Sequence, residues 1–200
     1  MGRKALEAEA AIKALPRGKF SLHWPVPGEH KINHKQGQDD PTGNGYFGWT
    51  RKLADGASKK HDGFDISAEV GAPVSASALG GVTILPLDPS GYGSQVIVDH
   101  GNGFFTQYGH LGGQLVEWPF AGDKNKKEWV LVFSAMSGRP RQPRTGDLVG
   151  VGDQIGVVGR SGNVPEKAQS HVPFEVRFGN DGQSKNTRTV VNPRYFLPLD

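Results

Sequence analysis

Hydrophobic and polar residues alternate over short stretches of this chain, and sustained helical periodicity is rare. The stretch from Ser94 to Asp99 (SQVIVD) is rich in β-branched residues, which favour strands. The turn sequence His100-Gly101-Asn102-Gly103 follows it, and Asn-Gly readily adopts the positive φ angles of a tight hairpin. Phe104 to Tyr108 is the predicted return strand. If that strand continues, Tyr108 and His110 project from the same face, because they lie two residues apart.

Further short strands and glycine turns are predicted on both sides of this hairpin. The expected strands are Asp65–Ile66, Ala72–Ala76, Val82–Leu85 and His171–Phe178, with turns at Gly80–Gly81 and Gly179–Gly182. The stretch 146–162 (GDLVGVGDQIGVVGRSG) predicts several short strands joined by tight turns. In the strand HVPFEVRF, residues His171, Pro173 and Glu175 face one side. With 29 glycines and 14 prolines in 200 residues, the pattern predicts a mainly β fold.

The chain divides into an arm and one main domain. Residues 1–19 are expected to form an N-terminal helical arm, with a short amphipathic helix from Gly2 to Leu15; a frayed tail is the alternative. Residues 20–200 are long enough to bury a single sizeable core. Within them, residues 29–60 are expected to form a long polar loop. Residues 112–145 are expected to be an insertion that could form an extra hairpin.

Composition and charge exclude several classes of function. The formal net charge of +3 is only mildly basic and no arginine-rich stripe with interleaved aromatic residues occurs, so nucleic-acid binding is not expected. No apolar run approaches the ~20 residues of a membrane span. The absence of cysteine excludes disulfides, thiolate metal sites and a cysteine nucleophile. The stretch from Met1 to Leu15 lacks the apolar core of a signal peptide.

The segment His61-Asp62-Gly63-Phe64-Asp65 carries the first candidate chemistry. An imidazole and a carboxylate are good zinc ligands, and the chain offers no metal-binding thiol. In a straight strand, residues four apart lie roughly 13 Å from each other, which is too far to share one ion. The chain must therefore bend between His61 and Asp65, and the backbone freedom of Gly63 is expected to allow the bend.

Two later histidines extend this set of residues. A hydrolytic zinc site needs three protein ligands and an open position for water, together with groups that take up a proton and stabilise the oxyanion. His61 and Asp65 are candidates for two of the ligands. His110 and His171 are candidates for the proton handling. The spacing of the residues does not identify a third ligand.

The chain also carries a longer series of short motifs. They are His61-Asp62-Gly63-Phe64-Asp65-Ile66, Gly71-Ala72-Pro73-Val74, Gly91-Tyr92-Gly93, Val98-Asp99-His100-Gly101-Asn102-Gly103, Thr106-Gln107-Tyr108-Gly109-His110-Leu111, Gly146-Asp147, Gly152-Asp153-Gln154-Ile155-Gly156-Val157-Val158-Gly159, Ser170-His171-Val172-Pro173-Phe174-Glu175-Val176 and Asn192-Pro193. In this combination the chain resembles the lysostaphin/LytM-type zinc metalloendopeptidases, which cut peptide cross-links in bacterial peptidoglycan. The resemblance implies a compact antiparallel β-sheet core of the barrel-sandwich-hybrid type, with a groove over a zinc ion. It also implies a periplasmic, cell-wall or extracellular site of action.

The resemblance assigns roles only at matching positions. His61 and Asp65 match two zinc ligands, and His110 matches the histidine that aids transition-state stabilisation. His171 matches the first histidine of a His-x-His pair, which acts with the zinc-bound water. The second histidine of that pair is the third zinc ligand, and its position here holds Pro173, whose side chain has no donor atom. The candidate substitutes are Glu175, His171 itself, and His30 or His34 from the long loop.

Two hypotheses follow from this departure. The chain is a zinc endopeptidase that hydrolyses peptide cross-links of the cell wall if another residue supplies the third ligand. Alternatively, it is a catalytically impaired pseudopeptidase that binds peptidoglycan or a partner cell-wall hydrolase. A carrier domain is a third class, because the stretch 146–162 is similar to segments of biotinyl/lipoyl domains, but the tip Arg160-Ser161-Gly162 lacks their lysine.

Overall fold

The computed structural model describes residues 21–28, 31–32, 45–52, 55–112, 114–117, 127–130, 143–166, 168–179 and 189–198. The predicted arm 1–19, His30 and His34, and most of the insertion 112–145 lie outside these residues. The elements are β1 (Gly48–Lys52), β2 (Ser58–His61), β3 (Phe64–Ser67), β4 (Pro73–Ser75), β5 (Gly80–Asp88), β6 (Gly93–Gly101), β7 (Phe104–Leu111), β8 (Gln114–Glu117), β9 (Lys127–Val130), β10 (Leu148–Val149), β11 (Gln154–Val157), β12 (His171–Phe178), β13 (Thr189–Val191) and the 3₁₀ helix η2 (Pro193–Tyr195).

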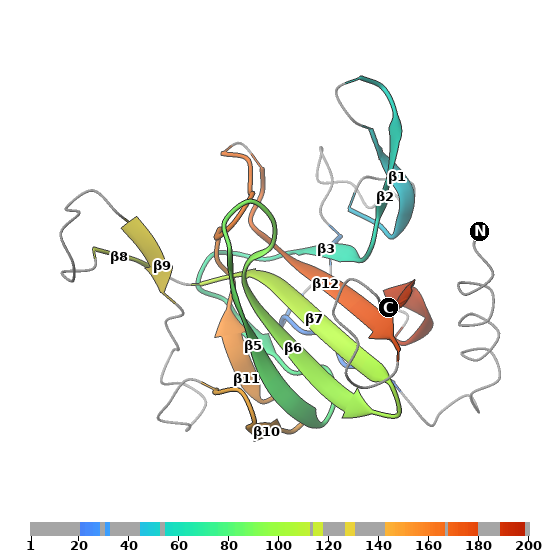
Figure 1. Cartoon of the computed structure of the whole chain (residues 1–200), viewed down its shortest axis with the longest axis vertical. Coiled ribbons are helices and arrows are strands. Elements are labelled where there is room, and N and C mark those ends of the chain that lie inside the picture. The colour runs from blue at the N-terminus through green and yellow to red at the C-terminus, as the bar shows by residue number, and fades with distance from the viewer. Residues whose placement is uncertain are drawn as a thin grey trace.

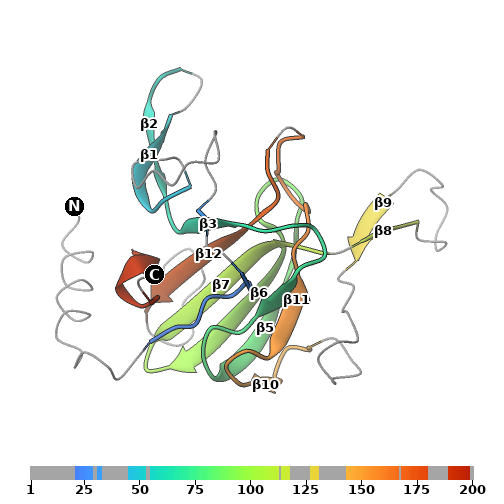
Figure 2. The same cartoon turned by 180° about the vertical axis from the view of Figure 1, so that it is seen from behind.

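A seven-stranded sheet forms the centre of the molecule, in the order β10-β5-β6-β7-β12-β13, with β3 also paired to β12. The paired strands are antiparallel throughout the described residues, which confirms the predicted mainly β, antiparallel fold. Figures 1 and 2 show that the β1–β2 and β8–β9 hairpins project from this sheet in different directions. No helix in the described part of the chain has the length and apolar character needed to cross a bilayer.

The hairpin predicted at residues 94–108 is confirmed as β6 and β7. Asn102 and Gly103 both adopt positive φ angles, of 52° and 77°, as the Asn-Gly turn requires. The predicted turn at Gly80–Gly81 is wrong, because both residues belong to β5. A side chain at Gly80 would place its Cβ 2.3 Å from the carbonyl oxygen of Asp99 on β6, so the glycine permits close approach of two strands instead of a turn.

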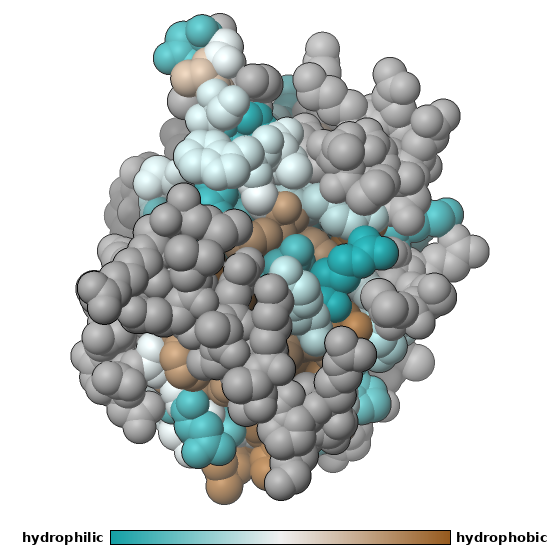
Figure 3. Space-filling model, turned by 90° about the vertical axis from the view of Figure 1, so that its right-hand side faces the viewer, coloured by the Kyte–Doolittle hydropathy of each residue, from teal (hydrophilic) through white to brown (hydrophobic). Residues whose placement is uncertain are grey.

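The prediction of one long loop over residues 29–60 is also wrong, because it contains β1 and β2. These strands pair around a turn in which the Asp55 carboxylate accepts a hydrogen bond from the Ala57 N–H, at 2.9 Å. The projecting end of the hairpin is largely hydrophilic (Figure 3), and residues 55–59 are exposed. Since this hairpin buries little apolar surface, its sequence lacks the alternation that reveals a half-buried strand.

The core lies against one face of β6, β7 and β12. Its fully buried side chains include Val96, Val98, Tyr108, Phe174, Val176, Val74 and Ile155. Tyr108 packs on Phe174 with ring centroids 5.4 Å apart. Its hydroxyl accepts hydrogen bonds from the Ser77 N–H and the Thr106 hydroxyl, both at 2.9 Å. The polar end of this buried tyrosine therefore has partners inside the core.

Replacing Tyr108 by phenylalanine is expected to lower the free energy of unfolding by about 1–3 kcal/mol, because the buried Ser77 N–H loses its acceptor. Urea denaturation followed by circular dichroism measures the change. Tyr195→Phe is the matched control, since Tyr195 is 53% exposed and its loss of a hydroxyl should cost less than about 0.5 kcal/mol. Equal effects of the two substitutions would contradict a structural role for the Tyr108 hydroxyl.

Candidate functional site

The short connection between β2 and β3 brings His61 and Asp65 together. His61 ends β2, Asp65 is the second residue of β3, and both side chains are buried. The His61 Nε2 atom lies 3.1 Å from Asp65 Oδ1. The His61 Nδ1 atom lies 2.9 Å from the carbonyl oxygen of Tyr46, and because a carbonyl only accepts, Nδ1 donates. This bond fixes the ring so that Nε2 faces Asp65.

The chain bends at Gly63 as expected, but for a different physical reason. Gly63 is not among the glycines with positive φ, so its backbone conformation is open to other residues. Space is what excludes a side chain: a Cβ at Gly63 would lie 2.2 Å from the carbonyl oxygen of Phe174 and 2.8 Å from Glu175 Cγ. The glycine therefore lets the His61–Asp65 bend pack directly on β12.

Strand β12 supplies the next residues of the site. In the antiparallel pairing of β3 and β12, Pro173 lies opposite Asp65 and His171 lies opposite Ser67. The His171 Nε2 atom is 3.9 Å from Asp65 Oδ1, and Nδ1 is 2.8 Å from the carbonyl oxygen of Gln169. His171 thus belongs to the same cluster as Asp65. The position next to Asp65 where the resemblance expects a third ligand carries only the pyrrolidine ring of Pro173.

His110 reaches this cluster because the backbone of β7 changes direction. Its φ angle is 52°, a conformation that non-glycine residues seldom adopt. The backbone is held by two hydrogen bonds, from its N–H to the Tyr92 carbonyl at 2.7 Å and from the Gly159 N–H to its own carbonyl at 3.0 Å. The ring lies 5.1 Å from that of His171, at 89°. Strained backbone of this kind is characteristic of functional positions.

The positive φ also corrects the prediction that Tyr108 and His110 share a face. Tyr108 packs on Phe174 in the core, whereas His110 lies against His171, which belongs to the other face of β12. The His110 Nδ1 atom donates a hydrogen bond to the Ser161 carbonyl, at 2.8 Å. The period of two that holds along a regular strand is therefore broken at the candidate site.

Burial and charge set the protonation of two site residues. Burial lowers the pKa of His110 to about 4, and the neighbouring His171 contributes to this shift, so the imidazole is neutral at pH 7. Burial alone would raise the pKa of Asp65. The hydrogen bond and charge of His61, then the charge of His171 and lastly that of Arg51, outweigh burial and hold this pKa below its usual value. Asp65 is therefore an anion at neutral pH.

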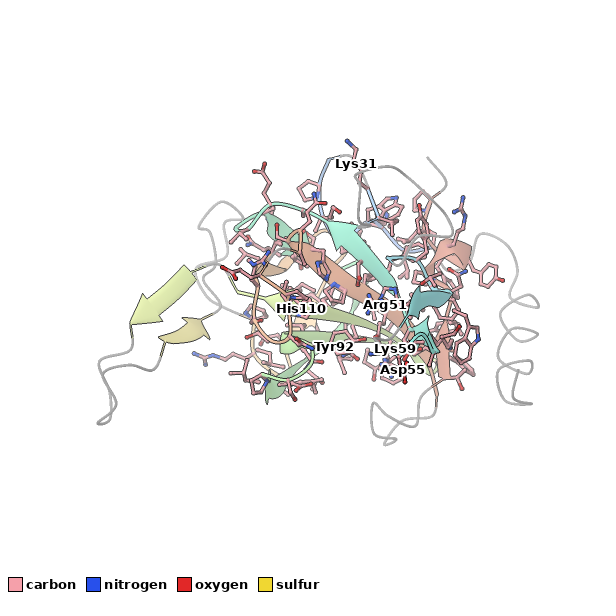
Figure 4. The ribbon with its side chains drawn as sticks, turned by 90° about the horizontal axis from the view of Figure 1, so that it is seen from above. Lys31, Arg51, Asp55, Lys59, Tyr92 and His110 are labelled. Carbon is pink, nitrogen blue, oxygen red and sulfur yellow. The ribbon has the colours of Figure 1, made fainter. Side chains whose placement is uncertain are left out.

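Arg51 is the residue of this site that the sequence did not reveal. It lies on β1, and its Nη2 atom donates a hydrogen bond to Asp65 Oδ2 and lies 3.0 Å from His61 Nε2. One guanidinium nitrogen thus contacts both residues that were predicted to be zinc ligands. Figure 4 shows Arg51 on the side of the β1–β2 hairpin, and the labelled His110 and Tyr92 close to each other. No local signal marks Arg51, because it stands in a polar stretch that was predicted to be a loop.

Glu175 does not supply the missing ligand. Its side chain is buried, and its carboxylate accepts hydrogen bonds from the Tyr92 hydroxyl and from Arg177 Nε, the latter at 2.7 Å. Both oxygens of Glu175 are therefore engaged by these two donors. The proposal that Glu175 replaces the third ligand therefore finds no support in the geometry.

The donor set of the described residues does not fit a three-ligand zinc site. Zinc in hydrolases needs three protein ligands, here His61, Asp65 and one more. Pro173 offers no donor, and Glu175 is engaged by Tyr92 and Arg177. His171 Nε2 lies 3.9 Å from Asp65 Oδ1, but no group of three histidine, aspartate or glutamate side chains within the described residues is arranged to hold a metal ion. The guanidinium of Arg51 contacts the two ligands that are present.

Comparison with known proteins gives a consistent group of matches. The sequence profile of Peptidase family M23 matches residues 59–144. The chain is 28% identical over 194 residues, 97% of its length, to the cell division protein DipM of Caulobacter vibrioides. It is 31% identical over 133 residues, 66% of its length, to the DD-carboxypeptidase/endopeptidase Mpg of Neisseria meningitidis serogroup B. The chain spans 23% of the length of each of these relatives.

A solved structure extends the match to the fold. The zinc-containing peptidase from Vibrio cholerae superposes with a TM-score of 0.54 and 22% sequence identity. The superposition covers 86% of this chain and 39% of the Vibrio cholerae chain. At this level of identity the likeness is one of fold, and it agrees with the antiparallel architecture described above.

Proposed function

Because the chain belongs to peptidase family M23, we propose that it is a peptidoglycan-directed domain that binds cell-wall peptides without hydrolysing them. It acts where such peptides are found, in the periplasm or at the cell wall. The similar proteins include a DD-carboxypeptidase/endopeptidase and a cell division protein. The family match supports a peptide of the bacterial cell wall as the class of ligand.

The contact of Arg51 with both His61 and Asp65 carries the non-hydrolytic part of this proposal. Hydrolysis in this family uses zinc to polarise a carbonyl and activate water, and a structurally similar peptidase contains zinc. Here Pro173 stands opposite Asp65 in place of a ligand, and the pair that remains is engaged by a guanidinium. Two ligands bound to a competing cation are a poor zinc site, so a binding role fits the residues better than catalysis.

The arrangement of His110 supports the binding part. A non-glycine residue with positive φ costs of the order of 1–3 kcal/mol, and such residues persist where the surroundings hold them. His110 is held by its neighbours at both backbone groups and at Nδ1. Its ring lies beside those of His171 and Tyr92, with centroid distances of 5.1 and 6.1 Å. Tyr92 is half-buried and the two histidines keep a small exposed fraction, which is the surface that they offer to a peptide.

The proposal predicts that the purified protein sediments with peptidoglycan sacculi and releases no soluble peptides from them, with or without added zinc. His110→Asn is expected to weaken binding several-fold, because it removes a ring contact worth about 1 kcal/mol. Asparagine tolerates positive φ, so the backbone at this position is kept. His23→Asn is the matched control, since His23 is exposed and far in sequence from the site.

Each other outcome points to a different function. Release of soluble peptides in the presence of zinc would contradict the proposal and favour the endopeptidase, with the third ligand supplied by His171, His30 or His34. Absence of sacculus binding would contradict the peptidoglycan ligand and favour a partner cell-wall hydrolase. Equal binding by the His110→Asn and His23→Asn variants would show that His110 does not contact the ligand.

A further inference from the structure

We propose that Arg51 takes the place of the metal ion: its guanidinium holds His61 and Asp65 together and excludes zinc, independently of the loss of the third ligand at Pro173. This inference deepens the proposed non-hydrolytic function and rests on it. It predicts that restoring a histidine at position 173 is not sufficient to create a zinc site. The geometry around His61, the path of β1 and the charge of the cluster each support it.

The contacts of His61 and Asp65 define a point at which one group can reach both side chains. The Nδ1 atom of His61 donates to the Tyr46 carbonyl, so Nε2 is the ring nitrogen that faces Asp65. Nε2 lies 3.1 Å from Asp65 Oδ1, and a group placed beside these two atoms can contact both residues. In a zinc site the metal plays this part. Here the Arg51 Nη2 atom lies 3.0 Å from Nε2 and donates to the other carboxylate oxygen of Asp65.

The path of β1 directs Arg51 to this position. The β1–β2 register is Lys52↔Ser58 and Arg51↔Lys59, but it then shifts so that Gly48 lies opposite His61. One extra residue on β1 therefore lies between Gly48 and Arg51, which is a β-bulge. Bulges commonly re-aim side chains beside functional sites. The bulge lies directly before the residue whose guanidinium reaches the His61–Asp65 pair.

The charge of the cluster makes Arg51 and zinc alternatives. The Asp65 carboxylate is buried, and its two oxygens face Arg51 on one side and His61 on the other. A divalent cation bound to Asp65 and His61 would have to share this space with a guanidinium that is always protonated. Binding of the ion therefore requires that Arg51 be displaced. A histidine at position 173 would add a ligand without removing this competing charge.

The test measures zinc alone, by isothermal titration, against five proteins: the wild type, Pro173→His, the double variants Arg51→Met/Pro173→His and Arg51→Gln/Pro173→His, and the control Lys59→Met/Pro173→His. Lys59 lies opposite Arg51 in the hairpin and is exposed, so its replacement removes one positive charge from the same hairpin while Arg51 stays in place (Figure 4). The two neutral substitutes for Arg51 differ in polarity, so the result does not depend on the folding of one variant.

Both Arg51 double variants are expected to bind one zinc ion about tenfold or more tightly than Pro173→His, the range typical for groups that surround metal ligands. The Lys59 control should match Pro173→His. A zinc-dependent rise in melting temperature, large for the Arg51 double variants and small for the others, provides a second readout. Zinc binding by Pro173→His as tight as that of the Arg51 double variants would overturn the assignment, and so would tight binding by the wild type.

Sacculus binding by the wild type separates this inference from the proposed function. If the Arg51 variants gain no zinc affinity while the wild type still binds sacculi without cleaving them, the role of Arg51 is wrong and the binding function stands. If the Arg51 variants gain zinc affinity but the wild type does not bind sacculi, the role of Arg51 stands and the proposed binding function is wrong.

Discussion

Replacing Glu175 by methionine is expected to lower the free energy of unfolding by about 3–5 kcal/mol, the usual result of removing one partner of a buried ion pair. Glu175 is 1% exposed, and its carboxylate accepts hydrogen bonds from Arg177 Nε and the Tyr92 hydroxyl. Arg177 is also buried, so the substitution leaves its guanidinium without this carboxylate. Urea denaturation with the midpoint and slope fitted separately measures the change.

The double variant Glu175→Met/Arg177→Met tests whether the unpaired charge is the cause of this loss. When both charges are replaced by apolar chains of similar length, no uncompensated charge remains, and the loss should be well below that of the single variant. Asp62→Asn is the surface control, because the Lys60–Asp62 pair is partly exposed with a 3.4 Å separation and should contribute less than about 1 kcal/mol. A double variant that loses as much as the sum of the two single variants would contradict the ion-pair explanation.

Replacing Gly63 by alanine is expected to cost about 3 kcal/mol, at the upper end of the usual effect of overpacking. The added Cβ would lie 2.2 Å from the carbonyl oxygen of Phe174. That oxygen belongs to the backbone of β12, which cannot rotate away as a flexible side chain would. For a chain of this size the melting temperature should fall by about 6–12 °C. Differential scanning calorimetry measures this shift directly.

Gly81→Ala is the matched control for Gly63→Ala. Gly81 is also a strand glycine without positive φ, and no atom lies within 4 Å of where its Cβ would be. Its replacement should change the free energy of unfolding by less than about 1 kcal/mol. A melting temperature for Gly63→Ala close to that of the wild type would show that β3 and β12 can move apart, and would contradict the close packing described for the His61–Asp65 bend.

The parts of the fold that carry strand or turn motifs in the local sequence could be predicted. The β6–β7 hairpin is marked by β-branched residues and an Asn-Gly turn, and β12 spans the predicted stretch His171–Phe178. The β1–β2 hairpin escaped prediction because it projects from the domain and, apart from His61, its described residues are exposed or half-buried, so no alternating pattern is imposed. The turn expected at Gly80–Gly81 failed because a glycine needed for close strand approach has the same sequence signal as a glycine needed for a turn.

The sequence indicated which residue types belong to the candidate site, but it did not indicate all of their side-chain contacts or backbone conformations. His61 and Asp65 were paired from their spacing and lie 3.1 Å apart, and His110 and His171 were grouped and have adjacent rings. Arg51 could not be found, because its position depends on a bulge and on a hairpin that has no sequence signal. The positive φ of His110 was equally hidden, since most histidines do not adopt that conformation.

The position of Arg51 on one strand and Pro173 on another has an evolutionary consequence. If a guanidinium stands where the metal would bind, a descendant that regains histidine at position 173 acquires a ligand but no metal, and so no activity on which selection could act. A descendant that loses only Arg51 gains no third ligand and gives up a partly buried ionic contact. With the role proposed for Arg51, the way back to a metal enzyme would cross an intermediate with no advantage, and a loss of zinc would be difficult to reverse.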